Sequence, residues 1–106
     1  MDQTVLRLYE IRIFRKVIKF VDELTHTDRA KVTANIKIME MGGFDSIYIK
    51  TLKGTIKELI VKNYRFVFFI YGHTIYIISA FIKKTQKTPP REISNAEKIY
   101  KIIIEK

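Results

Sequence analysis

A basic loop that joins an apolar run to a helical pattern decides the fold: residues 81–93 read FIKKTQKTPPREI. Before the loop, Ile75–Ile82 is rich in β-branched and aromatic residues and predicts a buried strand. After it, apolar residues recur at helical spacing: Ile93, Ala96, Tyr100 and Ile103. Thr88 is the expected N-cap of that helix, and Pro89 and Pro90 suit its first turn, where backbone N–H groups lack intrahelical partners. The segment therefore predicts a strand, a cationic loop and a helix in succession.

The charge of this loop points to an anionic ligand. Four cations precede its single acid: Lys83, Lys84, Lys87 and Arg91 come before Glu92. Lysine ammonium groups and the free N–H groups of a helix start both direct positive charge outward, which suits a phosphate group. A short run of lysines is also what an ordinary solvated turn contains. Charge alone leaves both interpretations open.

Composition sets broad limits on the function. The chain has 106 residues, which suits one domain over residues 1–106. A formal net charge of +9 favours a polyanionic partner without choosing among nucleic acid, the ribosome, an anionic membrane and an acidic protein. There is no cysteine, and His26 and His73 are the only histidines, so neither a metal site nor a cofactor is expected. No stretch approaches the roughly 20 apolar residues that span a bilayer, and we expect a cytoplasmic protein without a membrane partner.

Two helices are predicted in the first half of the chain. A weakly alternating stretch, Val5–Arg12, could form a first strand. Over Phe14–Leu24, apolar residues recur every three or four positions, which indicates an amphipathic helix. A second helix is expected to have Thr27 or Asp28 as its cap and to end at Gly42-Gly43. The two helices, joined by a short turn, should form a hairpin with an apolar face.

Three strands follow as an antiparallel meander: Thr55–Val61, Tyr64–Tyr71 and Thr74–Ile82. The last two strands are apolar on both faces, which indicates a central position covered above and below. The helical hairpin can cover one face, and the C-terminal helix or a partner the other. The expected architecture is therefore α+β, an antiparallel or mixed sheet of about four strands with an N-terminal helical hairpin and a C-terminal helix.

The order of residues in the loop resembles a known family signature. Residues 81–96 resemble the F-x-K-K-T-x-K-T-P-x-x-E-I-x-x-A signature of the phage-derived, HigB-like branch of the RelE/ParE toxin superfamily. Upstream, Lys50–Gly54 resembles the K-x-L-x-G element of that family, Glu58-Leu59 its E-L-R element and Tyr64-Arg65 its Y-R element. The resemblance covers most of the chain from about Lys50 onward. The RelE-like fold that it implies agrees with the order of elements read from periodicity.

The resemblance implies a function as well as a fold. It implies the toxin of a type II toxin–antitoxin system, a ribosome-dependent endoribonuclease (mRNA interferase) that cuts messenger RNA. Such toxins use Lys, Arg and Tyr or His groups, without a metal ion, while the ribose 2′-hydroxyl attacks the phosphodiester. The implied partners are a cognate antitoxin, which is a small helix-turn-helix protein, and the ribosome with its message.

The site residues are likewise implied by the resemblance. The catalytic candidates are the cations that would bind and stabilise the phosphate: Lys50, Lys53, Arg65, Lys83 and Lys84. The candidates for binding RNA or the ribosome are Lys62, Lys87 and Arg91. Lys83 and Lys84 leave the last strand, and we expect both to face solvent.

One position departs from the family pattern. The family usually places Arg after Glu-Leu, where this chain has Ile60. Lys62 or Arg65 could take the place of that arginine, although a residue further along a strand need not point to the same place. Two other functions stay open for this reason: a nucleic-acid or ribosome-binding module without catalysis, and a ParE-like gyrase inhibitor.

Overall fold

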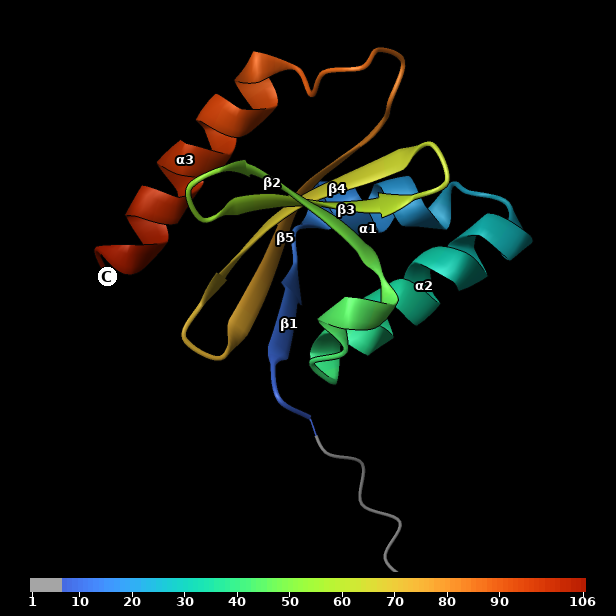
Figure 1. Ribbon diagram of the computed structural model, residues 1–106, viewed down its shortest axis with the longest axis horizontal. Helices are drawn as coiled ribbons and strands as arrows, with labels where there is room; N and C mark the ends of the chain where they lie inside the picture. The colour runs from blue at the N-terminus through green and yellow to red at the C-terminus, as the bar shows by residue number, and fades with distance from the viewer. Residues whose placement is uncertain (1–6) are drawn as a thin grey trace, which may run out of the picture.

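Five strands and three helices build the fold in the computed structural model, which describes residues 7–106 (Figure 1). The elements in chain order are β1 (Glu10–Ile13), α1 (Arg15–Asp22), α2 (His26–Glu40), β2 (Tyr48–Lys53), β3 (Ile56–Val61), β4 (Tyr64–Tyr71), β5 (Thr74–Ile82) and α3 (Pro90–Ile104). A short 3-10 turn, η1 (Phe44–Ser46), leads into β2. The expected α+β class is confirmed.

The strands form one mixed sheet in the order β1-β5-β4-β3-β2. Strands β2 to β5 are an antiparallel meander, and β1 joins β5 in parallel, with Ile13 opposite Ile77. The sheet therefore has five strands rather than about four, because the segment before the expected meander is itself the strand β2. A bulge between Thr51 and Lys53 interrupts its pairing with β3, which weakens the alternation that would have revealed it.

Helices α1 and α2 lie on one face of the sheet, as expected of the helical hairpin (Figure 1). The core beneath them is built from fully buried residues of the helices and the central strands: Val17, Val32, Met39, Leu59, Phe66, Phe68, Ile75 and Ile77. The ring of Phe20 lies edge-on to the rings of Tyr64 and Phe66, with centroids 5.9 and 6.0 Å away. The strand aromatics on this face are therefore core residues.

Helix α3 covers the opposite face of the sheet (Figure 1). A second buried cluster lies beneath it: Ile56, Val67, Phe69, Ile78 and Ala96. The ring of Phe69 packs edge-on against Tyr100 of α3, with centroids 5.0 Å apart. Because α3 begins only at Pro90, the loop from Lys83 to Pro89 lies over the end of the sheet beyond the helix. This end of the α3 face carries the candidate site.

Two helix starts differ from the sequence-based expectation. The N-cap of α2 is Thr25, whose hydroxyl accepts a 3.2 Å hydrogen bond from the backbone N–H of Asp28. The expected caps, Thr27 and Asp28, lie inside its first turn. The N-cap position of α3 is Pro89, and the hydroxyl of Thr88 makes no capping bond. The α2 cap was missed by two or three residues, because neighbouring Thr and Asp residues offer the same capping chemistry. The α3 cap was missed by one residue, because the hydroxyl of Thr88 donates to Glu58 instead.

The first strand and the first helix are shorter than expected. Strand β1 begins at Glu10, and residues 5 and 6 of the expected strand lie outside the described residues. Helix α1 ends at Asp22, where the predicted helix continues to Leu24. Within residues 7–106, no helix is both long and apolar enough to cross a membrane.

Candidate functional site

A fully buried carboxylate lies at the centre of the candidate site. Glu58 of β3 is 0% exposed and alternates with Leu59, so it lies on the α3 face of the sheet. The hydroxyl of Thr88 donates a 2.5 Å hydrogen bond to Oε2 of Glu58. Oε1 lies 3.7 Å from Nε of Arg65 and 4.0 Å from Nζ of Lys83. These four residues are called the Glu58 cluster below.

The two cations of the cluster compensate a charge that could not be buried alone. The side chains of Arg65 and Lys83 are themselves only 15% and 13% exposed. Both separations exceed hydrogen-bond length, and within residues 7–106 neither Oε1 of Glu58 nor Nε of Arg65 has a hydrogen-bond partner. Charge attraction therefore holds the two cations in place, and neither spends a hydrogen-bond donor on the carboxylate.

Arg65 lies next to Ile60, the position where the family pattern has an arginine. The two residues are direct partners in the β3–β4 ladder, so their side chains lie on one face with Cβ atoms about 5 Å apart. Nη1 of Arg65 donates to the backbone carbonyls of Lys62, at 2.9 Å, and Tyr64, at 3.0 Å. An arginine is thus present beside the position where the family pattern has one, held by the turn that precedes it.

Strand β2 brings one of its two candidate lysines to the cluster. Lys50 is the ladder partner of Glu58, and its exposed side chain lies on the same face. Lys53 follows the bulge, and its Nζ lies 3.2 Å from Oε2 of Glu97 on α3. The structure therefore places Lys50 beside the cluster and directs Lys53 away from it.

The loop lysines fall into two groups. The backbone N–H of Lys83 donates a 2.8 Å hydrogen bond to the carbonyl of Asn63, which continues the strand pairing and turns the ammonium inward. The expectation that Lys83 faces solvent is therefore wrong. Lys84 and Lys87 are exposed, and with Lys83 and Arg91 they help to line a pocket of about 240 Å³. The loop thus offers one buried cation beside an exposed cationic pocket.

Lys62 belongs to a different network, between α2 and the β3–β4 turn. Its Nζ lies 2.7 Å from Oδ1 of Asp28, and the hydroxyl of Tyr64 donates a 2.6 Å hydrogen bond to Oδ2. Lys62 has a φ of 54°, a left-handed conformation that suits the tight turn. The hydrogen bonds from Lys62 and Tyr64 lower the pKa of Asp28, and the same bonds raise the pKa values of Lys62 and Tyr64. Lys62 therefore lies apart from the Glu58 cluster, because its ammonium is directed to α2.

This network predicts a pH dependence of stability. A carboxyl whose folded pKa is lowered stabilises the fold above its unfolded pKa, and this contribution is lost as the pH falls through the folded value. For Lys62 and Tyr64, whose pKa values are raised, the contribution is complete below the unfolded pKa and is lost as the pH rises through the folded value. The difference in free energy of unfolding between the parent and Asp28→Asn should therefore be largest between roughly pH 5 and pH 9. Urea denaturation across the pH range measures it, and a difference that stays constant into acid and alkali would contradict this account.

Sequence reasoning missed two residues on the site face. Tyr48 of β2 is 77% exposed and is the ladder partner of Ile60, two residues from Lys50 on the same face. An exposed ring in this place can stack on a nucleic-acid base. The motif includes Glu58 without giving it a role, although the sequence around it indicates one. An acid among the apolar residues of a strand buried on both faces must have charged partners.

The arrangement concentrates positive charge on one face of the sheet end. Lys50, Arg65 and Lys83 lie around one neutralising carboxylate, and Lys84 and Lys87 extend the charge outward. Such a field attracts phosphate groups and stabilises negative charge that develops on them. As for metal ligands, residues 7–106 contain no group of three His, Asp or Glu side chains placed to hold an ion.

Comparison with known proteins places this chain in a family. Residues 19–101 match the family described as Phage derived protein Gp49-like (DUF891). Among solved structures, the chain is similar to a chain of the archaeal RelE-RelB complex from Pyrococcus horikoshii OT3, with a TM-score of 0.65 and 17% sequence identity. That alignment covers 71% of this chain and 94% of the archaeal chain, and it shows that the fold is RelE-like. No curated protein matches the sequence. The matched segment spans most of the chain, which therefore belongs to the Gp49-like family of phage derived proteins.

Proposed function

We propose that this protein is the toxin of a type II toxin–antitoxin system, of the HigB-like branch, and that it cuts messenger RNA on the ribosome. The observation that carries the proposal is the Glu58 cluster, which holds Arg65 and Lys83 beside the exposed Lys50 on one sheet face. The RelE-like fold supports the same reading. A set of cations fixed by a buried acid suits a reaction in which charge builds up on phosphorus.

The proposed reaction is attack of the ribose 2′-oxygen on the adjacent phosphorus, which breaks the bond to the 5′-oxygen and leaves a 2′,3′-cyclic phosphate. The 2′-hydroxyl gives up its proton as the new bond forms, and the departing 5′-oxygen gains one. Lys83 and Arg65 stabilise the additional negative charge on the phosphoryl oxygens, and Lys50 binds the phosphate from the edge strand. Because the cations are already in position, little reorganisation is needed when the charge develops. Side chains supply this stabilisation, so the mechanism is metal-independent.

The proposal includes a cognate antitoxin. The similar archaeal structure is a complex of RelE with RelB, which by analogy favours a partner protein for this chain. The resemblance to HigB-like toxins makes a small helix-turn-helix antitoxin, acting in the cytoplasm, the proposed partner. The ribosome and its message would be the other partners. The net charge of +9 favours both an acidic antitoxin and an RNA-rich target.

Induced expression with and without the protein of the adjacent reading frame tests the function. Without that partner, growth should stop, and the 5′ ends of cleaved messages should map within translated regions on ribosomes. With the partner, growth should continue. Unimpaired growth at verified expression of the toxin alone would count decisively against the proposal, and loss of DNA supercoiling with intact messages would indicate a gyrase inhibitor.

Binding to RNA or the ribosome without catalysis is the second candidate function. The hydrogen bonds of Arg65 favour it, because its Nη1 already donates to two backbone carbonyls. Ile60 provides no second guanidinium group for the phosphate. A non-catalytic module would slow translation and sediment with ribosomes while messages stay uncut. Mapping of message ends therefore separates the two candidates.

A further inference from the structure

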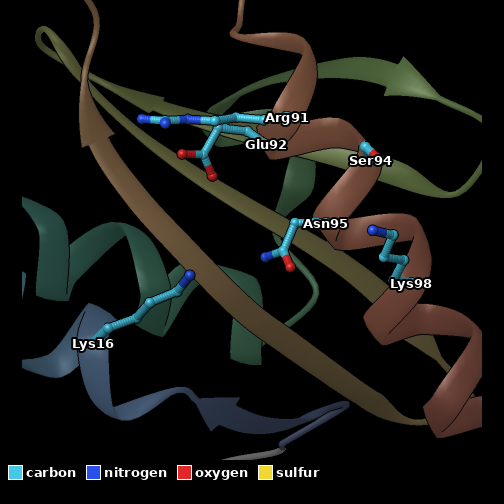
Figure 2. A pocket seen from close by; sticks show the side chains of 6 residues that line it. All are labelled: Lys16, Arg91, Glu92, Ser94, Asn95 and Lys98. Atoms are coloured by element: carbon cyan, nitrogen blue, oxygen red, sulfur yellow. The ribbon is translucent and has the colours of Figure 1, made fainter.

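A second polar pocket lies beside α3, away from the Glu58 cluster. It has a volume of about 460 Å³ and is lined by Lys16, Arg91, Glu92, Ser94, Asn95 and Lys98. Strand β1 pairs with β5 only as far as Ile77, so the last part of β5 has no strand neighbour on that side. Figure 2 shows Lys16 of α1 on one side of the β5 ribbon and the α3 residues on the other, with Glu92 and Asn95 pointing toward the space between.

The pocket is cationic, and its cations are available to bind an anion. Within residues 7–106, none of its three cations, Lys16, Arg91 and Lys98, takes part in an ion pair. Its one acid, Glu92, already accepts a 2.5 Å hydrogen bond from the hydroxyl of Ser79. The remaining lining, Ser94 and Asn95, provides neutral hydrogen-bond donors and acceptors. The pocket therefore suits an anion that also presents hydroxyl groups.

The lining also distinguishes between kinds of polyanion. All six residues are polar or charged, and no apolar side chain lines the pocket. An acidic protein segment would depend on buried apolar or aromatic anchors for its affinity. A nucleic-acid backbone needs none, because its interfaces are polar, wet and strongly positive. The lining thus favours RNA over an acidic peptide.

The pocket is continuous with the loop of the candidate site. Arg91 and Glu92 line both this pocket and the smaller pocket formed by Lys83, Lys84 and Lys87. On α3, Arg91 and Lys98 are seven residues apart, which places them two turns along the same side of the helix. A basic track therefore leads from the Glu58 cluster around the start of α3 to Lys16.

We infer that the pocket between α1 and α3 is a binding subsite for the phosphodiester backbone of RNA that extends beyond the cleavage site. The inference rests on the proposed function for the choice of RNA. Lys16 and Lys98 bind phosphate groups there, and Ser94 and Asn95 contact sugar hydroxyls. The strand is either the message itself or ribosomal RNA, which share this chemistry.

The test is the double variant Lys16→Ala, Lys98→Ala. Its charge-matched control is Lys31→Ala, Lys37→Ala, which removes two exposed cations of α2 that do not line the pocket. One probe is a short single-stranded RNA that keeps its 2′-hydroxyls and that a ribosome-dependent reaction leaves uncut, and the other is the intact ribosome. Affinity is measured from low to moderate salt, and thermal melting checks that all variants are folded.

The expected result is a loss of affinity on the order of tenfold at low salt for the pocket variant. The slope of log affinity against log salt should fall by about 1.4, from about 0.7 per cation on a single strand. The control should keep the parental affinity and slope. A loss with the oligonucleotide assigns the strand to the message, and a loss with ribosomes alone assigns it to ribosomal RNA.

Four outcomes overturn the inference. Equal losses of RNA affinity in the pocket variant and the control would show that the net charge of the protein, and not the pocket, determines RNA binding. A parent protein that binds neither probe would exclude the subsite, and so would a pocket variant with the affinity of the parent. Reduced binding of the antitoxin with unchanged RNA affinity would assign the pocket to the protein partner. Because the short RNA stays uncut in this measurement, a protein that binds it but never cuts messages would fail the proposed function and still keep the subsite.

Discussion

Replacing Glu58 by alanine is expected to lower the free energy of unfolding by about 3 to 5 kcal/mol. The change leaves the nearly buried Arg65 and Lys83 without their counter-charge, which is the costly way to break a buried ion pair. It also removes the acceptor of the Thr88 hydroxyl, so the loop loses its attachment to β3. In a domain of this size, the melting temperature should fall by roughly 12 °C or more. Urea denaturation and thermal melting measure the two quantities.

Glu97→Ala is the matched control. It removes the carboxylate that pairs with Lys53. The side chain of Glu97 is 43% exposed and that of Lys53 is 66% exposed, so the free energy of unfolding should fall by less than about 1 kcal/mol. Glu58→Gln keeps the volume and can still accept the bond from Thr88, so its cost should lie between the two. Equal losses for Glu58→Ala and Glu97→Ala would mean that burial of the Glu58 cluster has no energetic importance.

Lys83→Met should slow the cleavage of messages on the order of tenfold to a thousandfold, the range seen when one preorganised electrostatic donor is lost. Methionine fills the space of the apolar stem of lysine but carries no charge. Arg65 and Thr88 still contact Glu58 in this variant, so the free energy of unfolding should fall by only about 1 to 3 kcal/mol. Cleavage is measured on programmed ribosomes at a temperature where parent and variant are both folded.

A variant of the exposed neighbour Lys84 tests whether cleavage requires an ammonium group that is held in place, as that of Lys83 is. Lys84→Met should leave stability unchanged and reduce cleavage less than Lys83→Met, because no buried group holds its side chain. Lys37→Met on α2 controls for the loss of one charge. A folded double variant of Lys83 and Lys84 that cuts at the parental rate would mean that the loop lysines take no part in catalysis. The chemistry would then belong to Lys50 and Arg65, or be absent.

The parts of the fold that periodicity could predict are those with strong local patterns. Strands β3 to β5 have long β-branched and aromatic runs with clear turns between them, and their predicted bounds agree with the structure within one residue. Helix α3 follows two prolines and a regular apolar stripe, and its start was predicted within about two residues. These elements are specified by residues close to one another in the chain.

The candidate site depended on information that local patterns do not contain. Lys50 and Lys53 are three residues apart, yet Lys50 is the ladder partner of Glu58, whereas Lys53 lies beyond a bulge and pairs with Glu97 of α3. Lys62 appeared as one more site cation, but a left-handed turn directs it to α2. Each outcome depends on strand register and on partners distant in sequence, and these are set only when the sheet is complete.

The parallel pairing of β1 with β5 has a consequence for the order of events during synthesis. β1 leaves the ribosome well before β5, because two helices and three strands lie between them in the chain. Ile11 and Ile13 therefore cannot pair until β5 has emerged. Closing so long a stretch of chain costs entropy before the contact is made, which makes this step slow. Lys83 comes directly after β5 and reaches Glu58 only once that strand is in place. A nascent chain therefore has no assembled cation cluster until β5 and the loop that follows it have left the ribosome.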